Sequence, residues 1–242
     1  MPSKKLNIVV PVLNEADYLV THFKKQLSIF NSLNSEKFNI IFTDNGSQDN
    51  SVALLKEMTT NKYTIIAEKN NIQSIARSVN IALKKLKPTS DYVLILPIDC
   101  TINAEALAKV HSVVRSNKWG GLNKTYTHTN WFIQIYLWLQ NNFRSSILKN
   151  VVWTNGLFFP LDLLEKNNYL IEENTFLEDI ILCDYLKKNH ASQFIFLKNY
   201  KIIVNSRKYL KEFPIRQILK NLIILSLYRF KLKSIQELKK LY

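Results

Sequence analysis

The chain has 242 residues, of which 47% are hydrophobic, so it can bury one sizeable core without disulfides or structural metals. Its two cysteines, Cys100 and Cys183, have no CxxC spacing and its four histidines have no metal-ligand spacing, which argues against a disulfide scaffold and a zinc site. The net charge of +14 favours polyanionic partners: phosphates, nucleic acid or an anionic membrane surface.

Hydrophobic, β-rich runs alternate with helix-like segments through the first hundred residues. The expected strands are LNIVVPV from Leu6, FNIIFT from Phe38, YTIIA from Tyr63 and DYVLILP from Asp91. Amphipathic segments long enough for crossover helices separate them, at 15–33, 48–58 and 72–87. This alternation predicts an α/β fold with a mostly parallel central sheet flanked by helices.

The second half of the chain has a looser pattern. In order, we expect a helix at 104–117, a Trp-Gly-Gly turn at 119–121, an aromatic-rich helix from Trp131, a strand within VVWTNGLFFP, a helix at 176–189, two short strands QFIFL and KIIVN, and a basic, leucine-rich helix at 214–230. No repeat or linker is visible, so a single domain is expected. The cysteine usage fits a reducing compartment, and the basic N-terminus leads directly into a strand without an apolar signal segment, so no export is implied and a cytoplasmic location is expected.

Only four glycines occur, at positions 46, 120, 121 and 156, and no GxGxxG or GxxxxGK[ST] motif can be written. This excludes the common glycine-rich dinucleotide and phosphate-binding loops. A bound nucleotide would be held by side chains and by loops at the carboxyl edge of the sheet.

Polar motifs follow two of the predicted strands. V-V-P-V-L-N-E contains Pro11, Asn14 and Glu15, and T-D-N-G-S-Q-D contains Asp44, Gly46 and Ser47. A carboxylate at a strand end can accept a hydrogen bond from a nucleotide base, and glycine permits a tight turn. The alternative is structural: a proline that stops the strand and polar side chains that cap the next helix.

Two further motifs lie near predicted strand ends. I-A-R-S-V-N-I-A contains Arg77 and Asn80, and L-P-I-D-C-T contains Asp99. Mg²⁺ and Mn²⁺ prefer oxygen ligands and need only one or two carboxylates when a donor supplies phosphates. Arg77 is otherwise a solvated helix residue.

The last motifs are T-N-G-L-F-F-P, F-L-E-D-I and N-S-R-K-Y. They contain Asn155 and Gly156, Glu178 and Asp179, and Arg207 and Lys208, respectively. Acidic residues at a helix start also complement the helix dipole, so an isolated Glu-Asp pair would carry little weight.

Together and in this order, the motifs resemble those of family-2 glycosyltransferases with the GT-A fold, over about residues 6 to 230. The T-D-N-G-S-Q-D heptad resembles the family's D-[DG]-G-S-x-D motif, and F-L-E-D-I resembles its E-D motif. L-P-I-D resembles the metal-binding DxD motif, with Pro97 in place of the first aspartate. N-S-R-K-Y resembles an S-x-R-R-[WY] element of one bacterial branch.

The resemblance implies an inverting transfer of sugar from a nucleotide sugar, with a UDP or GDP carrier, to an acceptor hydroxyl. It implies a nucleotide-binding half at about 1–100, an acceptor half at 101–210 and basic C-terminal helices at 211–242. Asp179 would be the general base, beside Glu178, and a divalent metal, Mg²⁺ or Mn²⁺, would bind at Asp99. The acceptor would lie near Asn155 and Gly156. The donor would contact Pro11, Asn14, Glu15, Asp44, Gly46, Ser47, Arg77, Asn80, Asp99, Arg207 and Lys208.

Other functions stay open at this point. A nucleotidyltransferase is disfavoured because the segment 11–17 has neither glycine nor lysine, and a non-catalytic sugar-nucleotide binder is suggested by Pro97. Nucleic-acid binding rests on charge alone, and no recognisable nucleic-acid module appears, so no such partner is expected.

The acceptor is expected to be a small molecule or a lipid, as in glycolipid or cell-envelope synthesis. The basic, apolar segment 213–233 and the aromatic segment 131–139 suit a peripheral contact with the inner face of the cell membrane. The alternative is that both segments pack on the sheet.

Overall fold

The computed structural model describes residues 4–59, 62–68, 74–87, 91–173, 177–207, 223–224, 226–228 and 237. The chain forms two compact units, one of residues 1–125 with 129–204 and one of residues 126–128 with 205–242. Lys208 and most of the predicted basic helix at 214–230 lie outside the described residues; those described within it, 223–224 and 226–228, are helical.

One half of the sheet is parallel. It contains β1 (Leu6–Val12), β2 (Phe38–Asp44), β3 (Thr64–Ala67) and β4 (Tyr92–Ile95), in the spatial order β3-β2-β1-β4. These strands match the four expected from the hydrophobic runs. Because they are parallel, the loops that follow β1, β2 and β4 lie at the same edge of the sheet, where ligands of open α/β sheets bind.

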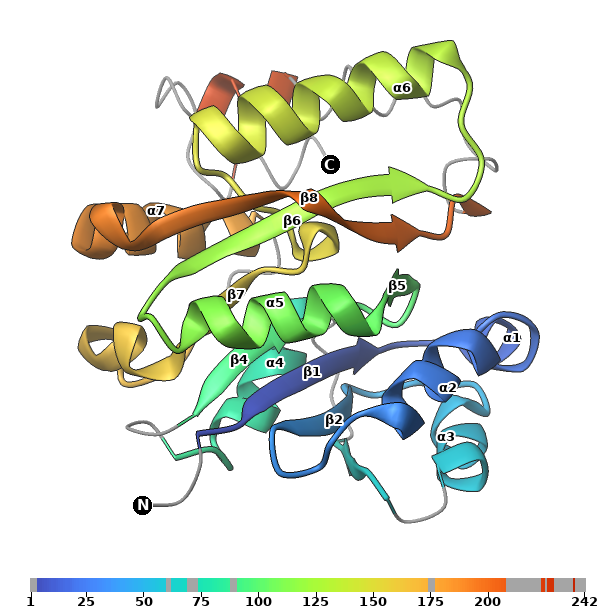
Figure 1. The fold of residues 1–242 in the computed structure, drawn as a ribbon. Coiled ribbons are helices and arrows are strands. Elements are labelled where there is room, and N and C mark those ends of the chain that lie inside the picture. Colours follow the sequence, from blue (N-terminus) through green and yellow to red (C-terminus); the bar gives the residue numbers. More distant parts are fainter. Residues whose placement is uncertain are drawn as a thin grey trace. The chain divides into compact units, whose positions relative to one another are not determined.

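The other half of the sheet is built differently. It adds β7 (Phe158–Pro160), β6 (Trp119–Tyr126), β8 (Phe194–Val204) and β5 (Cys100–Ile102), in that spatial order (Figure 1). β7 runs antiparallel to both β4 and β6, and β5 runs antiparallel to β8. The two short strands expected at QFIFL and KIIVN form one continuous strand, β8.

The turn predicted at Trp119–Gly121 is wrong, because these residues begin β6. A Cβ atom on Gly120 would lie 1.7 Å from the carbonyl oxygen of Ile195 in β8. Gly120 is thus required by close backbone approach within the sheet and not by a turn. The strand expected in VVWTNGLFFP is also shorter than predicted: Trp153–Asn155 form a 3₁₀ turn (η2) before β7.

The helices of the described segments are α1 (Ala16–Thr21), α2 (Lys24–Ser32), α3 (Ser51–Thr59), α4 (Ile75–Leu83), α5 (Ala104–Val114), α6 (Trp131–Trp138) and α7 (Glu178–His190). A π-helix, η1 (Leu139–Ile147), continues α6, and further 3₁₀ segments are η3 (Leu161–Asn167) and η4 (Ala191–Gln193). The single helix predicted at 15–33 is two helices. The break brings Phe23 into the core, where its ring contacts Phe30 and Phe42.

Helices cover both faces of the parallel half of the sheet. On one face, Val9 and Ile41 belong to a buried cluster with Val79 of α4 and Leu182 of α7. On the other face, α2 packs aromatic rings on β2, and α5 places His111 against Phe38 at a ring-centroid distance of 5.4 Å. The two faces follow from the alternation of side chains along each strand.

Candidate active site

The loops after β1 and β2 are joined by hydrogen bonds. The side-chain oxygen of Asn14 accepts from the backbone N–H of Gln48 at 2.8 Å, and the Asn14 N–H donates to the Ser47 hydroxyl at 2.9 Å. Asp44 Oδ1 accepts from the N–H groups of Gly46 and Ser47 at 2.9 and 3.0 Å, across a turn in which Gly46 has φ of 94°. Four of the predicted donor-binding residues are therefore brought together.

The second oxygen of the Asp44 carboxylate differs from the first in its hydrogen bonding. Oδ2 is buried and has no hydrogen-bond partner among the described residues. Buried polar atoms are nearly always satisfied in folded proteins. An acceptor left in this way at the carboxyl end of β2 suits the N–H of a nucleotide base.

A second set of bonds holds the start of α1. The Glu15 N–H donates to the Ser51 hydroxyl at 2.8 Å, and Asp49 Oδ2 accepts from the Ala16 N–H at 2.9 Å. Burial alone raises the pKa of Asp49, but the hydrogen bonds from Ser51 and Ala16 bring that pKa below its ordinary value. Asp49 is therefore ionised, and as a carboxylate it joins the start of α1 to the start of α3 at the edge of the site.

Asp99 follows β4 in a loop tied to β1. The N–H of Ile98 donates to the Pro11 carbonyl at 3.3 Å, which is the observed role of Pro11, and the Pro97 carbonyl accepts from the Cys100 N–H at 2.9 Å. Asp99 is buried, and its charge adds to desolvation in raising the pKa of Tyr18, on α1, to about 12. Pro97 builds a turn where the family motif has a carboxylate.

No group of three or more His, Cys, Asp or Glu side chains that suits a metal exists in the described part of the chain. The donor set thus does not form an all-protein metal cage. A single carboxylate fits Mg²⁺ or Mn²⁺ when phosphates and water complete the coordination. Asp99 would hold such an ion together with a donor diphosphate.

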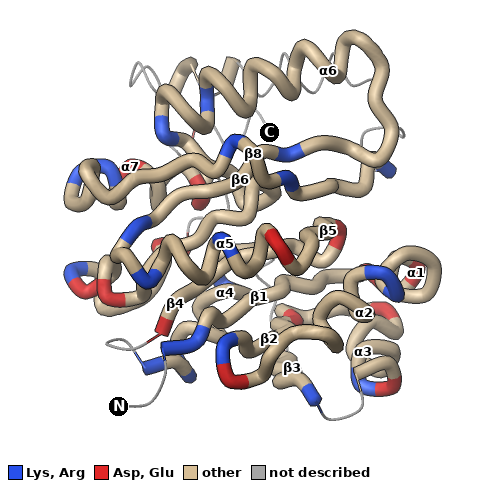
Figure 2. The backbone as a smooth tube through the Cα atoms, in the orientation of Figure 1, with Lys and Arg blue, Asp and Glu red and all other residues tan. Residues whose placement is uncertain are grey.

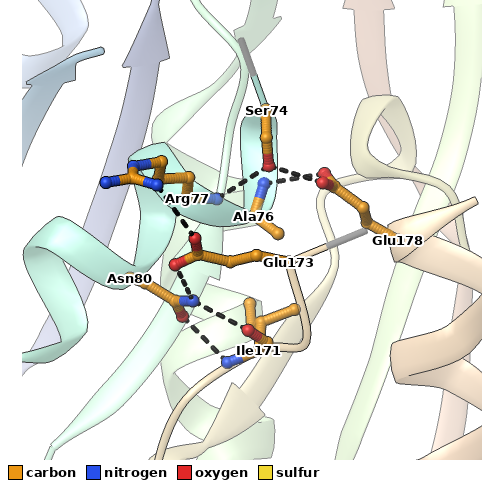
Figure 3. Close-up of polar contacts among 7 residues, drawn as sticks. All are labelled: Ser74, Ala76, Arg77, Asn80, Ile171, Glu173 and Glu178. Atoms are coloured by element: carbon orange, nitrogen blue, oxygen red, sulfur yellow. Dashed lines mark hydrogen bonds and ion pairs between the residues drawn. The ribbon is translucent and has the colours of Figure 1, made fainter. Parts of the chain in front are cut away.

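Arg77 and Asn80 lie on α4 and face the segment that precedes α7 (Figure 3). Arg77 forms an ion pair with Glu173 at 3.6 Å, with both side chains about one-third exposed. Asn80 is buried: its amide donates to the Ile171 carbonyl at 2.7 Å and to Glu173 at 2.9 Å, and its oxygen accepts from the Ile171 N–H at 2.8 Å. Asn80 thus fixes a backbone segment, whereas the Arg77 side chain is partly exposed and its guanidinium is paired with Glu173.

Glu178 uses both carboxylate oxygens to hold α4 (Figure 3). Oε1 accepts from the Ser74 hydroxyl at 2.5 Å and Oε2 accepts from the Ala76 N–H at 2.9 Å. Ser74 is also the N-cap of α4, since its hydroxyl accepts from the Arg77 N–H at 3.0 Å. The first residue of α7 is therefore joined to the first turn of α4.

Asp179 stands in a different environment from its neighbour. Desolvation raises the pKa of its carboxyl, while Arg144, the backbone N–H groups of Ile180 and Trp153, and Lys124 oppose this rise. The Ile180 N–H donates to Oδ1 at 2.8 Å. A desolvated carboxylate with a raised pKa has the character needed to accept a proton.

The predicted acceptor-side residues have structural contacts, and their role at the acceptor stays a prediction. Asn155 is fully buried, and its amide donates to the Leu122 carbonyl at 2.7 Å and to Asn141 at 3.3 Å. Gly156 has φ of 60°, and a Cβ there would lie 2.4 Å from the Ile202 side chain. Both residues set the shape of the turn that precedes β7.

Arg207 belongs to the second unit, in which its N–H donates to the Asn205 side chain at 3.0 Å. Burial lowers the pKa of its guanidinium. A role for Arg207 at the donor stays a prediction.

Sequence reasoning missed Ser74, Lys124, Arg144 and Glu173. Lys124 gave no sign in the sequence, because it lies between the polar residues Asn123 and Thr125 of β6. The others belong to no motif, because their roles depend on contacts between distant segments.

Residues 7–160 match the model of glycosyl transferase family 2. The chain belongs to this family. No curated protein matches it.

Solved structures share its fold. S. aureus TarS, residues 1–349 with UDP-GlcNAc, is 16% identical with a TM-score of 0.61; the alignment covers 84% of this chain and 59% of TarS 1–349. A mannosyltransferase from Pyrobaculum calidifontis, in complex with GDP-Man and Mn²⁺, is 14% identical with a TM-score of 0.63. The alignment covers 97% of this chain and 67% of the mannosyltransferase. Glucosyl-3-phosphoglycerate synthase from Mycobacterium tuberculosis, in complex with Mn²⁺, UDP-Glc and glycerol 3-phosphate, is 14% identical with a TM-score of 0.61. The alignment covers 93% of this chain and 80% of the synthase.

The predicted GT-A fold is confirmed by these likenesses. The chain spans less than two thirds of the length of TarS 1–349.

Proposed function

We propose that the protein transfers a sugar from a UDP- or GDP-sugar to an acceptor hydroxyl, with inversion. The observation that carries this proposal is Asp179: a desolvated carboxylate with a raised pKa, beside cations, at the start of a helix joined to α4. The acceptor oxygen forms a bond to the anomeric carbon while the bond from that carbon to the diphosphate breaks. The electron pair leaves with the nucleoside diphosphate, and Asp179 takes the hydroxyl proton.

The donor is held at the carboxyl edge of the parallel strands in this proposal. Asp44 Oδ2 accepts from the base, and the partly exposed side chain of Arg77 contacts the base or the diphosphate. Asp99 would hold a divalent cation together with the donor phosphates, and such a cation would supply positive charge for the leaving group. Asn14, Gly46 and Ser47 shape the loops around the base.

A panel of UDP- and GDP-sugars tests this function, with released nucleoside diphosphate measured in the presence of Mn²⁺, Mg²⁺ or chelator. We expect one donor to be turned over and Asp99→Asn to weaken metal-dependent donor binding. Binding of a donor without turnover under every condition would favour the alternative, a non-catalytic or nucleotidyltransferase-like sugar-nucleotide binder.

We further propose that the acceptor is a lipid or lipid-linked molecule, reached by peripheral contact with the inner face of the cell membrane. Large apolar side chains of α6, η1 and the C-cap residue of η1 are exposed: Trp131, Ile135, Trp138, Leu139, Phe143, Ile147 and Leu148. The inward face of η1 is polar, with Gln140, Asn141 and Ser145 buried. Monomeric proteins rarely expose an apolar stripe of this kind without a partner.

Charge favours a bilayer as that partner. Between Glu105 and Asp162 the sequence has six Lys or Arg residues and no acidic residue. Figure 2 shows Lys and Arg, but no Asp or Glu, on β6 and β8. Exposed tryptophans and nearby cations suit the interface of an anionic membrane. Within the described segments, no helix has the length and apolar character to span a bilayer.

Sedimentation with anionic and with neutral liposomes tests the contact. We expect the protein to sediment with anionic liposomes at low salt, and the double variant Trp131→Ser, Trp138→Ser to stay in solution. Val20→Ser is the control, because Val20 is an exposed apolar residue of α1. If the unmodified protein binds neither kind of liposome, the membrane contact is contradicted and the acceptor is a soluble small molecule.

A further inference from the structure

Lys124 is a buried lysine in the middle of β6, with only 5% of its surface exposed. Burial and the nearby charge of Arg144 lower the pKa of its ammonium group to about 7, while Cys100 and Asp179 act in the opposite direction. Burying an ammonium group is unfavourable unless neighbouring groups compensate, and methionine would fill similar space without a charge. The charge therefore calls for a functional explanation.

The backbone of Lys124 is held from both sides by one side chain. Asn141, in the π-helix η1, accepts from the Lys124 N–H at 3.1 Å and donates to its carbonyl at 2.9 Å. Asn155 donates to the same Asn141 oxygen at 3.3 Å. π-helical segments occur frequently at functional sites, and here the segment supplies both Asn141 and Arg144.

The end of the Lys124 side chain reaches the turn next to the proposed base. Its Nζ lies 3.5 Å from the hydroxyl oxygen of Thr154. The adjacent residue, Trp153, donates its backbone N–H to Asp179. Two neighbouring residues of one 3₁₀ turn thus contact the lysine and the carboxylate.

The charges around this pair come from four elements. Asp179 interacts with Arg144 of η1, Lys124 of β6 and Cys183 of its own helix. Lys124 interacts with Arg144, Asp179 and Cys100 of β5. A buried carboxylate is unfavourable when ionised, and a cation within a few ångströms reverses that effect.

We propose that Lys124 is a positioning residue for Asp179: its ammonium group, carried on a backbone held by Asn141 and directed to the Thr154 hydroxyl, keeps the Asp179 carboxylate ionised so that it can take the proton of the acceptor. This inference rests on the proposed function. Lys124 acts through Asp179 and forms no bond to the sugar.

The test compares Lys124→Met and Lys124→Gln, which remove the charge, with Lys124→Arg, which keeps it. Lys198→Met is the control, because Lys198 is an exposed lysine of β8. Aspartate-¹³C NMR follows the titration of Asp179, assigned by comparison with Asp179→Asn, and kcat/KM is measured against pH. Thermal unfolding of every variant identifies any that does not fold.

In Lys124→Met and Lys124→Gln we expect the Asp179 midpoint and the acidic limb of the kcat/KM profile to move to higher pH, by less than loss of the Arg144 charge would move them, because Arg144 has the larger influence on Asp179. Lys124→Arg and Lys198→Met should leave both near their original positions. An unmoved Asp179 midpoint in a folded, neutral variant would overturn the proposal. The two claims are tested independently. If no donor is turned over, the proposed function is contradicted, but the NMR midpoint of Asp179 still shows whether Lys124 keeps that carboxylate ionised.

Discussion

Two adjacent carboxylates, Glu178 and Asp179, have opposite environments. Glu178 accepts two hydrogen bonds from the first turn of α4, whereas Asp179 is desolvated and has a raised pKa. Environments of this kind separate the roles of neighbouring carboxyl groups in enzymes. The sequence predicted both residues for the site, but only the contact with α4 suggests that Glu178 acts by positioning.

Replacement of Glu178 by Gln and by Ala distinguishes positioning from chemistry. Glutamine keeps an oxygen that can accept from Ala76, so we expect Glu178→Gln to retain most of the transfer rate. We expect Glu178→Ala to lose on the order of tenfold or more, because α7 is released from α4. Initial rates at saturating donor measure both. A Glu178→Gln enzyme as inactive as Glu178→Ala would assign the charge of Glu178 to the reaction.

The raised pKa of Asp179 predicts the direction of the pH dependence. A general base must be ionised to accept a proton. The transfer rate is therefore at its full value above the pKa of Asp179 and declines as the pH falls below that pKa. We expect this acidic limb at a higher pH than the ordinary aspartate value of about 3.9. The kcat/KM profile measures it, and donor binding over the same range is the control. A profile flat down to the ordinary value would contradict the assignment.

At the scale of elements, the periodicity of the sequence predicted the four parallel strands and most helices. It failed where close packing replaces local preference. Gly120 looked like a turn residue, but β6 needs it because the Ile195 backbone of β8 lies against it. The break between α1 and α2 and the π-helix η1 likewise depend on what the sheet and core require, which local patterns do not contain.

Gly120→Ala tests the packing of β6 on β8. A Cβ 1.7 Å from a backbone oxygen forces the strands apart, and we expect a loss of roughly 3 kcal/mol or more in the free energy of unfolding. Gly121→Ala is the comparison, since its closest contact is a side-chain methyl group of Val151 at 2.4 Å and the nearest backbone atom, the Asn155 carbonyl oxygen, lies at 3.1 Å; we expect a smaller loss there. Urea unfolding measures both. Similar stability of Gly120→Ala and the unmodified protein would show that the strands do not approach so closely.

At the scale of the molecule, the first unit unites the motifs that were far apart in the sequence. The parallel order β3-β2-β1-β4 places the loops of Asn14, Asp44 and Asp99 at one edge, as the βαβ pattern predicted. The contacts of Lys124, Arg144 and Glu173 could not be predicted, because they join β6, the π-helix and the segment before α7 to parts of the chain that are distant in sequence.

The transfer rate of Asp179→Asn at saturating donor tests the central claim most directly. Asparagine keeps the shape of the side chain but is not a base, so we expect a rate roughly two to four orders of magnitude below that of the unmodified enzyme. Donor affinity, measured by calorimetry on the same preparation, should be nearly unchanged, because the proposal places the donor at Asp44, Arg77 and Asp99. Near-normal transfer by Asp179→Asn would contradict the account.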